Sequence, residues 1–372
     1  MTTVRFLHTA DWQLGLRRHY LKAEALPRYV QARIDAVRTL ADLAREQECE
    51  FAVVAGDVFE SNHVDRTTLG RALDALEAFP CPVFLLPANH DPHDAASVYR
   101  APRFGSHPRA RVLASAEPVA VRPGVEVVGA PWASKRPGAD LVADLCGSLA
   151  PFDGVRVGVA HGVVDTLALG GSDPARIVLA EVEAALADGR LHYLALGDRH
   201  STTKVTPRVW YSGTPEPTAF DEADPGCALV VDLGPGRCDV RKHRVAQWRF
   251  ETVEAALDGA ADVDALAARL DALPYKDRTV LRLGLKGALG LKDKARLDTR
   301  LDEARDLFAA LESWARGSDV VVLPDDLSDL DLAGFARGAA DDLAALAAGT
   351  GERSAAARDA LALLFRLAGG VA

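Results

Sequence analysis

The sequence predicts an α/β fold for the larger, N-terminal part of the chain and a smaller α+β domain after it. Short apolar runs alternate with amphipathic stretches over the first two thirds of the 372 residues. This alternation is typical of strands joined by helices in a layered, largely parallel sheet. Beyond about residue 250 the pattern changes, and residues 251–372 carry 22 acidic against 15 basic side chains. We therefore expect two domains, over residues 1–250 and 251–372.

Five apolar runs of the first domain are predicted to be β-strands, because each concentrates valine, leucine, alanine or phenylalanine over a short length. They cover residues 4–11, 51–59, 81–91, 155–162 and 193–200. A long helix is expected over residues 24–48, where apolar side chains recur at helical spacing, and a second helix over 66–78. Residues 110–132 and 202–246 are predicted to form antiparallel hairpins.

The second domain is expected to combine helices with two strands. The predicted helices cover residues 262–273, 295–315, 331–347 and 354–368, and the predicted strands cover 279–288 and 320–324. The last two helices concentrate large apolar side chains, namely Leu343, Leu346, Leu361, Leu363, Leu364, Phe365 and Leu367. These side chains either pack on the second domain or bind a partner protein.

Composition excludes several classes of protein. The net charge of −10 argues against a surface coated with nucleic-acid-binding charge, although a single basic groove is compatible with it. No apolar stretch is long enough for a membrane span, so no membrane association is expected. The first residues, MTTVRFLHTADW, lack the features of a signal peptide, and we expect a cytoplasmic protein. Five cysteines without a CxxC spacing argue against both a disulfide framework and a zinc knuckle.

Polar side chains follow each of the five predicted strands of the first domain. They are Asp11, Asp57, Asn89, His90, Asp91, His161, Asp198 and His200. Ligands of open α/β sheets bind outside the carboxyl ends of the strands, so we expect these side chains to converge on one site. Oxygen ligands mixed with imidazoles suit Mn, Fe, Mg or Zn. Two such ions that share a carboxylate activate a water and stabilise an in-line displacement at phosphorus.

The motifs at these strand ends resemble the calcineurin-like metallophosphoesterase superfamily and, within it, the SbcD-type DNA repair exonuclease family. The resemblance is carried by HTADWQLG (8–15), GDVFE (56–60), ANHD (88–91), AHG (160–162), LGDRH (196–200) and the later stretch WYSGTPEP (210–217). It covers residues 1–245. It implies a four-layer β-sandwich flanked by helices, with residues 251–372 as a capping or specificity domain.

The resemblance implies a role for each matched residue. Asp11 and His200 would bind a first metal ion, Asp57 would bridge two ions, and Asn89 and His161 would bind the second. His90, oriented by Asp91, would protonate the leaving oxygen or stabilise the transition state, which suits an imidazole because it titrates near neutral pH. The family implies Mn²⁺ as the working ion, and the residues themselves also accommodate Mg²⁺ or Fe²⁺.

Two positions depart from the family pattern. The family has Asp-x-His in the first motif, where this chain has Gln13, and Gly-His-x-His in the last, where it has Asp198. Gln13 can ligate through its carbonyl or hold a water, and Asp198 can ligate as a carboxylate and adds a negative charge. Both exchanges favour harder ions over zinc. Trp12, between two of these positions, is interpreted as a core residue rather than a base-stacking surface.

The function predicted from this resemblance is a metal-dependent DNA nuclease in repair or end processing. Arg17, Arg18 and His19 follow the first motif closely and are the expected contacts to DNA phosphates. The chain encodes no P-loop, and the family implies a separate SbcC-type coiled-coil ATPase and a homodimer. The alternatives are a phosphodiesterase acting on nucleotides or other small phosphodiesters, and a non-catalytic scaffold for an ATPase.

Overall fold

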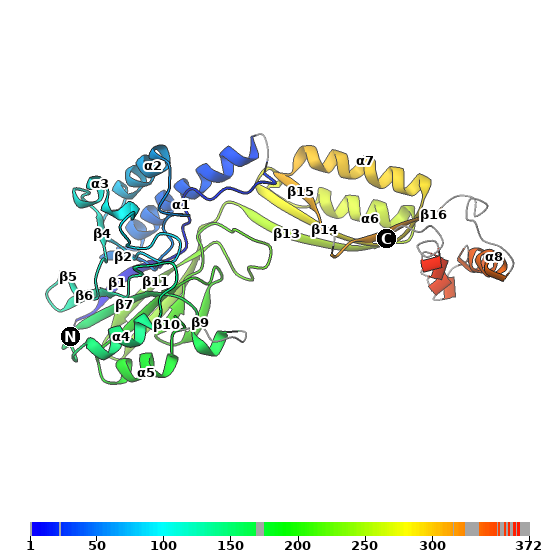
Figure 1. Cartoon of the computed structure of the whole chain (residues 1–372). Helices are drawn as coiled ribbons and strands as arrows, with labels where there is room; N and C mark the ends of the chain where they lie inside the picture. The colour runs from blue at the N-terminus through cyan, green and yellow to red at the C-terminus, as the bar shows by residue number, and fades with distance from the viewer. Residues whose placement is uncertain are drawn as a thin grey trace. The chain divides into compact units, whose positions relative to one another are not determined.

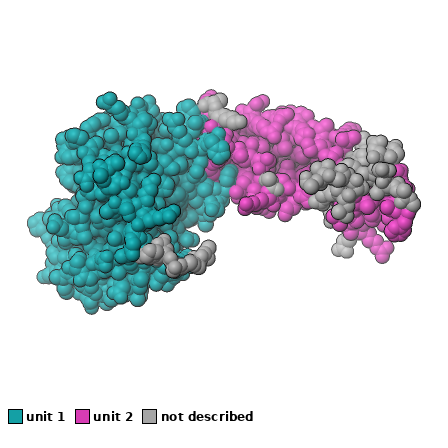
Figure 2. All heavy atoms as spheres, in the orientation of Figure 1, with its two compact units in different colours: residues 1–19, 26–248 teal, residues 20–25, 249–372 magenta. Residues whose placement is uncertain are grey.

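The computed structural model describes residues 2–21, 24–168, 175–314, 316–323, 335–347 and 349, and the positions 353, 354, 356, 357, 360, 361, 363 and 364. The chain divides into two compact units (Figure 2). The first unit contains Met1–His19 and Leu26–Trp248. The second contains Tyr20–Ala25 and Arg249–Ala372.

The first unit contains two six-stranded sheets (Figure 1). In the first sheet, β1 (Val4–Thr9), β2 (Phe51–Val54), β3 (Val83–Leu85) and β4 (Ala110–Val112) run parallel, and β11 (Cys227–Gly234) and β12 (Arg237–Arg244) continue it antiparallel beside β1. In the second, the parallel strands are β6 (Val125–Gly129), β7 (Val155–His161), β8 (Tyr193–Gly197) and β10 (Val209–Tyr211). Its antiparallel edges are β5 (Val119–Arg122) and β9 (Thr203–Thr206).

The two sheets pack face to face, and helices cover their outer faces. Phe6, Phe51 and Phe84 from the first sheet share a buried cluster with Val157 and Tyr193 from the second. Because side chains alternate along a strand, the residues between these positions point outward to the helices. The helices are α1 (Ala25–Glu46) and α2 (Arg66–Glu77) on the first sheet and α4 (Leu141–Ser148) and α5 (Leu179–Ala187) on the second. This four-layer arrangement confirms the predicted α/β fold class.

Short elements complete the first unit. They are the 3₁₀ turns Val98–Arg100 and Asp165–Leu167 and the one-turn helix α3 (Pro102–Gly105). Helix α2 begins where the Asp65 carboxylate accepts a hydrogen bond of 2.8 Å from the Thr68 N–H, and Asp140 caps α4 in the same way. These caps satisfy N–H groups that a helix end leaves unpaired.

The second unit is built on a parallel sheet with β14 (Thr279–Gly290) at its centre. The strand β13 (Arg249–Leu257) pairs along one side of β14, and β15 (Ala310–Ser313) and β16 (Asp319–Leu323) pair along the other. The helices α6 (Ala260–Asp271) and α7 (Leu291–Leu307) pack on one face of this sheet through a cluster of leucines and valines (Figure 1). The unit also contains the 3₁₀ turn Lys276–Arg278 and the helix α8 (Phe335–Ala347).

Two predicted elements differ from the structure, and a third lies largely outside the described residues. The helix expected over 295–315 ends at Leu307, because the Phe308 side chain is buried against the sheet and the chain then forms β15. The hairpin expected over 110–132 is confined to β5 and β6, since β4 pairs parallel with β3. Within the last expected helix, 354–368, many positions lie outside the described residues, among them Phe365 and Leu367.

No helix among the described residues is long and apolar enough to cross a membrane. All five cysteines are free thiols. Four of them are buried, and Cys238 is partly buried.

Candidate metal centre

The candidate site lies where the carboxyl ends of strands from both sheets meet. Asp11 follows β1, Asp57 follows β2, and His161 ends β7. One ligand atom from each of these residues lies within 4.8 Å of the other two, and all three side chains are buried. Two carboxylates and an imidazole at this spacing form a cluster that can hold a divalent cation.

The orientation of His161 leaves one ring nitrogen free to bind a metal. Its Nδ1 lies 2.8 Å from the carbonyl oxygen of Ala55, and because a carbonyl can only accept, Nδ1 carries the proton. In the neutral ring Nε2 therefore presents its lone pair, 3.5 Å from the Asp57 carboxylate and 3.6 Å from that of Asp198. This Nε2 is buried and has no hydrogen-bond partner among the described residues. A buried imidazole nitrogen without a partner, facing carboxylates, is the arrangement that a metal ion completes.

His200 and Gln13 form a second pair at the same site. The Gln13 side-chain amide lies 3.3 Å from His200 Nε2. On the other side of the ring, Nδ1 lies 2.7 Å from the Glu222 carboxylate and 2.8 Å from the Thr218 hydroxyl. The carboxylate fixes the proton on Nδ1, so that Nε2 is available as a ligand. Glu222 was not among the predicted site residues, because only the folded loop brings it next to His200.

Asn89 and His90 approach the centre from the loop after β3. The Asn89 Oδ1 atom is buried without a hydrogen-bond partner in the described chain, as His161 Nε2 is. The His90 backbone N–H donates to the Asp57 carboxylate at 3.1 Å, and its ring Nε2 lies 3.9 Å from the same carboxylate. Its Nδ1 donates to the Glu60 carbonyl oxygen at 2.9 Å. The ring is about one third exposed, so a substrate can reach it.

The hydrogen bonds of Asp91 differ from the role expected for it. Its carboxylate accepts from the Phe59 and Ala88 N–H groups at 2.9 and 3.1 Å and from the Tyr99 hydroxyl at 2.6 Å. Asp91 therefore fixes the loops that carry Asp57 and Asn89, whereas the Glu60 carbonyl orients His90. Asp91 is the neighbour of His90 in the sequence, and this adjacency suggested a pairing that the folded loops do not make.

The backbone at the candidate ligands is strained. Six non-glycine residues of the described chain have positive φ, and four of them are Asp11 (54°), Gln13 (43°), Asp57 (51°) and Asp198 (96°). Such conformations cost free energy and persist only where the surrounding structure imposes them, which is most common at functional sites. The strain turns these side chains toward one centre instead of letting them alternate as along a strand.

Two glycines let the strand ends approach one another. A Cβ atom on Gly56, where φ is +92°, would lie 2.3 Å from His161 Nδ1. A Cβ atom on Gly197 would lie 1.9 Å from the Ala55 carbonyl oxygen that accepts from His161. The glycines of GDVFE and LGDRH therefore provide the space in which this imidazole sits.

The buried carboxylates give the site a strongly negative potential. Burial lowers the pKa of His161, but the charges of Asp57, Asp11 and Asp198 outweigh it and raise that pKa to about 9. Burial raises the pKa of Asp11 to about 6. Burial also opposes protonation of His200, but its hydrogen bond to Glu222 and the charge of Asp11 raise its pKa. A site that draws protons onto its imidazoles in this way also favours a bound cation.

Arg33 supports the loop that contains Asp11 and Gln13 through hydrogen bonds to its backbone. Its guanidinium is 2 % exposed and donates to the Trp12 carbonyl oxygen at 2.7 and 2.9 Å, and to the Glu216 carbonyl oxygen at 3.2 Å. The Thr214 hydroxyl donates to the Asp11 carbonyl oxygen at 2.8 Å. The stretch 210–217 thus packs against the loop that contains Asp11. Trp12 itself is 1 % exposed, which confirms its interpretation as a core residue.

The residues expected to contact DNA lie on the chain that leaves this loop. Arg17 and His19 are exposed, and Arg18 is partly buried, with its Nε atom lacking a hydrogen-bond partner among the described residues. Asp65, the capping residue of α2, lies within electrostatic range of Arg17.

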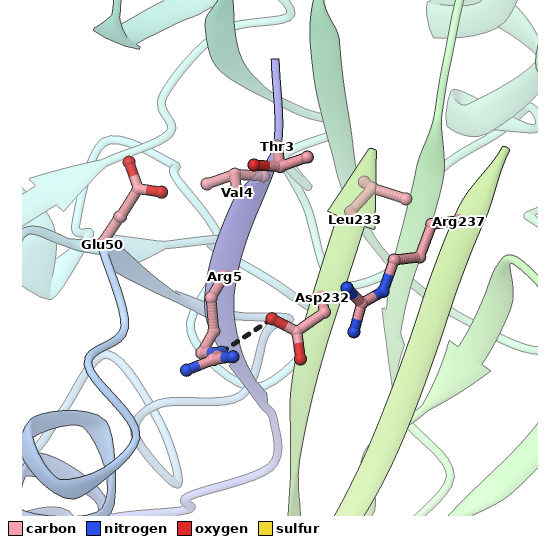
Figure 3. A pocket seen from close by; sticks show the side chains of 7 residues that line it. All are labelled: Thr3, Val4, Arg5, Glu50, Asp232, Leu233 and Arg237. Carbon is pink, nitrogen blue, oxygen red and sulfur yellow. Dashed lines mark hydrogen bonds and ion pairs between the residues drawn. The ribbon is translucent and has the colours of Figure 1, made fainter. Parts of the chain in front are cut away.

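A separate hollow of about 280 Å³ lies at the beginning of β1, away from the carboxyl ends of the strands (Figure 3). Its charged lining is largely paired, since Arg5 Nε lies 2.7 Å from Asp232 and Arg237 Nε lies 2.7 Å from Asp239. It shares no residue with the candidate metal centre.

Comparison with known proteins agrees with the site. Residues 4–166 match the family model described as calcineurin-like phosphoesterase. This span contains Asp11, Asp57, Asn89 and His161 and ends before Asp198. No curated protein matches the chain.

Several solved structures match part of the chain at low identity. The protein TT1561 of Thermus thermophilus is 13 % identical and matches over 66 % of this chain and 100 % of its own, with a TM-score of 0.42. Purple acid phosphatase PPD1 from seeds of yellow lupin, Lupinus luteus, is 9 % identical over 66 % of this chain and 52 % of its own (TM-score 0.40). A dimetal phosphatase from Danio rerio is 12 % identical over 65 % of this chain and 99 % of its own (TM-score 0.37).

The first unit thus resembles the calcineurin-like phosphoesterase family over residues 4–166, and Asp11, Asp57 and His161 form its candidate metal centre.

Proposed function

We propose that the protein is a metal-dependent DNA nuclease that acts in repair or end processing, as the nuclease subunit of an SbcCD-like complex. One observation is the main support for metal-dependent hydrolysis. His161 Nε2 and Asn89 Oδ1 are buried without hydrogen-bond partners in the described chain, beside the carboxylates that surround the site. The motifs shared with SbcD-type nucleases support DNA as the substrate.

The donor set suits two divalent ions. Asp11, Gln13 and His200 would hold the first, Asn89, His161 and Asp198 the second, and Asp57 both. When bound, such ions polarise the phosphate and lower the pKa of a bound water, so that hydroxide is available at neutral pH. The oxygen-rich set, with Gln13 and Asp198 in place of imidazoles, favours Mn²⁺, with Mg²⁺ or Fe²⁺ as alternatives.

His90 is the candidate proton donor. The Glu60 carbonyl oxygen fixes its Nδ1, and the ring Nε2 is turned toward Asp57 and the centre. In its imidazolium form, His90 can give the Nε2 proton to the leaving oxygen of the broken phosphodiester bond. Asp57 also accepts a hydrogen bond from the His90 backbone N–H. Asp57 would therefore fix the position of the proton donor relative to the metal ions.

DNA would reach the centre past Arg17, Arg18 and His19, whose charges can pair with backbone phosphates. The second unit would act as a capping or specificity domain. Because the chain lacks a P-loop, an SbcC-type coiled-coil ATPase would supply the energy for end processing, with its binding site among the C-terminal helices.

A nuclease assay on end-labelled DNA tests this proposal, with Mn²⁺ added and His90→Ala compared with wild type. His63→Ala is the matched control, because His63 is an exposed histidine on the loop after β2 whose hydrogen bond to Ser61 is made by its backbone N–H. We expect cleavage by wild type and His63→Ala and strong loss in His90→Ala. Activity confined to small diesters such as bis(p-nitrophenyl) phosphate would replace the nuclease by a small-molecule phosphodiesterase. Inactivity of wild type on both substrates would favour a scaffold.

A further inference from the structure

Arg199 stands between two candidate metal ligands and does not pair with either. It follows Asp198 directly and precedes His200, in the loop after β8. Its Nε donates to the Thr203 hydroxyl at 3.0 Å, and that hydroxyl donates to the Ser201 carbonyl oxygen, also at 3.0 Å. The guanidinium is thereby held by one N–H, while its terminal nitrogens make no hydrogen bond to the described residues.

Arg199 also has no acidic partner in the described part of the chain. The nearby centre contains the carboxylates of Asp11, Asp57 and Asp198, yet none of the described carboxylates lies within ion-pair distance of Arg199. The side chain is exposed, whereas the candidate ligand cluster is buried. Arg199 is therefore an exposed cation next to two candidate ligands in the chain, held at Nε by Thr203 and with its terminal donors open to solvent.

A second observation relates Arg199 to the loop that follows β7. The Tyr211 hydroxyl donates to the carbonyl oxygen of Gly162, the residue after His161, at 2.8 Å. Burial raises the pKa of this hydroxyl, and the positive charge of Arg199 acts in the opposite sense. Arg199 thus lies within electrostatic reach of the loop that follows β7.

We propose that Arg199 binds a phosphate adjacent to the one that is cleaved, and so selects substrates that carry more than one phosphate. The buried carboxylates and imidazoles serve the scissile phosphate. An exposed guanidinium next to two of them in the chain, held at Nε and with its terminal N–H donors free, suits a neighbouring phosphate, because a guanidinium can donate two parallel hydrogen bonds to phosphate oxygens. This inference rests on the proposed phosphodiesterase activity and names the substrate feature that the site recognises.

The test compares the thymidine dinucleotide dTpdT with the same dinucleotide phosphorylated at both ends. In wild type we expect the KM of the phosphorylated form to be lower by about tenfold, the range of a charge-assisted hydrogen bond. Arg199→Ala removes most of this preference, and Arg199→Lys restores part of it, because lysine keeps the charge without the fork of donors. The control is Arg237→Ala, an exposed arginine at the start of β12 (Figure 3), which keeps the wild-type ratio.

Binding of both dinucleotides, measured by calorimetry in Mn²⁺, separates this inference from the nuclease proposal. A binding preference in wild type that Arg199→Ala removes, together with no cleavage of end-labelled DNA by wild type, supports Arg199 and refutes the nuclease. Equal binding of the two dinucleotides by wild type, or a preference that persists in Arg199→Ala, overturns the role of Arg199 whether or not the protein cleaves DNA.

Discussion

The Glu222 carboxylate lies 2.7 Å from Nδ1 of His200 and fixes the imidazole so that Nε2 points to the centre. Glu222 is itself held by the backbone N–H of Thr218 at 2.9 Å and by the Thr218 hydroxyl. Burial opposes its ionisation, but the hydrogen bonds from His200 and Thr218 lower its pKa, so it is charged at neutral pH. Carboxylates in this position increase the basicity of a histidine ligand.

Replacing Glu222 should therefore weaken metal binding without removing a ligand. We expect Glu222→Gln to lower the Mn²⁺ affinity by about 10- to 100-fold, the usual range for a partner of a ligating histidine. Isothermal titration calorimetry on the purified variant measures this change. Glu183→Gln, an exposed position of α5, is the matched control. Wild-type affinity in Glu222→Gln would show that His200 does not depend on this hydrogen bond.

Asp57 is the residue on which both ions depend. Its carboxylate lies 3.5 Å from His161 Nε2 and also accepts from the His90 N–H. Asp57→Ala should abolish divalent-ion binding in calorimetry, because neither half of the donor set retains its shared ligand. Asp74→Ala, an exposed aspartate of α2, should keep the wild-type stoichiometry. Two ions bound normally by Asp57→Ala would refute the bridging role.

Gly56 should tolerate no side chain. In Gly56→Ala the new Cβ would lie 2.3 Å from His161 Nδ1 at a φ of +92°. We expect the free energy of unfolding to fall by at least about 2 kcal/mol, because strain and overpacking add. Urea denaturation measures the loss. Gly147→Ala, at an open position of α4, should instead be neutral or slightly stabilising. Equal stability of both variants would contradict the close packing around His161.

His8 should make the metal-free protein sensitive to mild acid. Burial lowers its pKa from 6.5 to about 3, and the neutral ring is satisfied by Tyr193 and the Leu196 carbonyl oxygen. The unfolded chain therefore binds the extra proton between pH 6.5 and 3, so stability is lost as the pH falls through this window. Between pH 7 and 5 wild type should lose about 2 kcal/mol more than His8→Gln. Urea denaturation at the two pH values checks this, and parallel losses in the two proteins would contradict it.

DNA affinity should depend steeply on salt if Arg17 and Arg18 follow the phosphate backbone. For the double variant Arg17→Ala/Arg18→Ala, the slope of log affinity against log salt should decrease by about 0.9 for each phosphate that is no longer neutralised. Fluorescence anisotropy over a salt series measures both slopes. Arg45→Ala/Arg237→Ala removes the same charge from exposed residues near the amino ends of the strands and should retain the wild-type slope. A flat response in wild type would argue against a phosphate-tracking groove.

The sequence predicted the convergence of Asp11, Asp57 and His161 because each follows an apolar run, and parallel strands end at the same edge of a sheet. The hydrogen bonds that orient the site residues could not be predicted from the sequence. Glu222 is 22 residues from His200, and the carbonyl that orients His90 belongs to Glu60, 30 residues away. Neither pairing has a periodic or spacing signal, since both depend on how loops fold over the strand ends.

The fold class was predictable from the alternation of strands and helices, but individual boundaries were not. The helical pattern of α7 continues past Leu307, although Phe308 turns into the core and β15 begins at Ala310. Similarly, nothing in the three-residue sequence of β4 indicates that it pairs with β3, the strand before it, rather than with β5, the strand after it. These elements are decided by tertiary packing rather than by local pattern.

The left-handed backbone at Asp11, Gln13, Asp57 and Asp198 also limits how this centre can change during evolution. Glycine adopts such a conformation freely, asparagine and aspartate adopt it at modest cost, and β-branched residues resist it. An exchange of Asp198 for asparagine leaves the main chain undisturbed, whereas threonine or valine would distort it. The ions that descendants of this protein could recruit are therefore restricted by the path of the main chain as well as by the chemistry of the side chains.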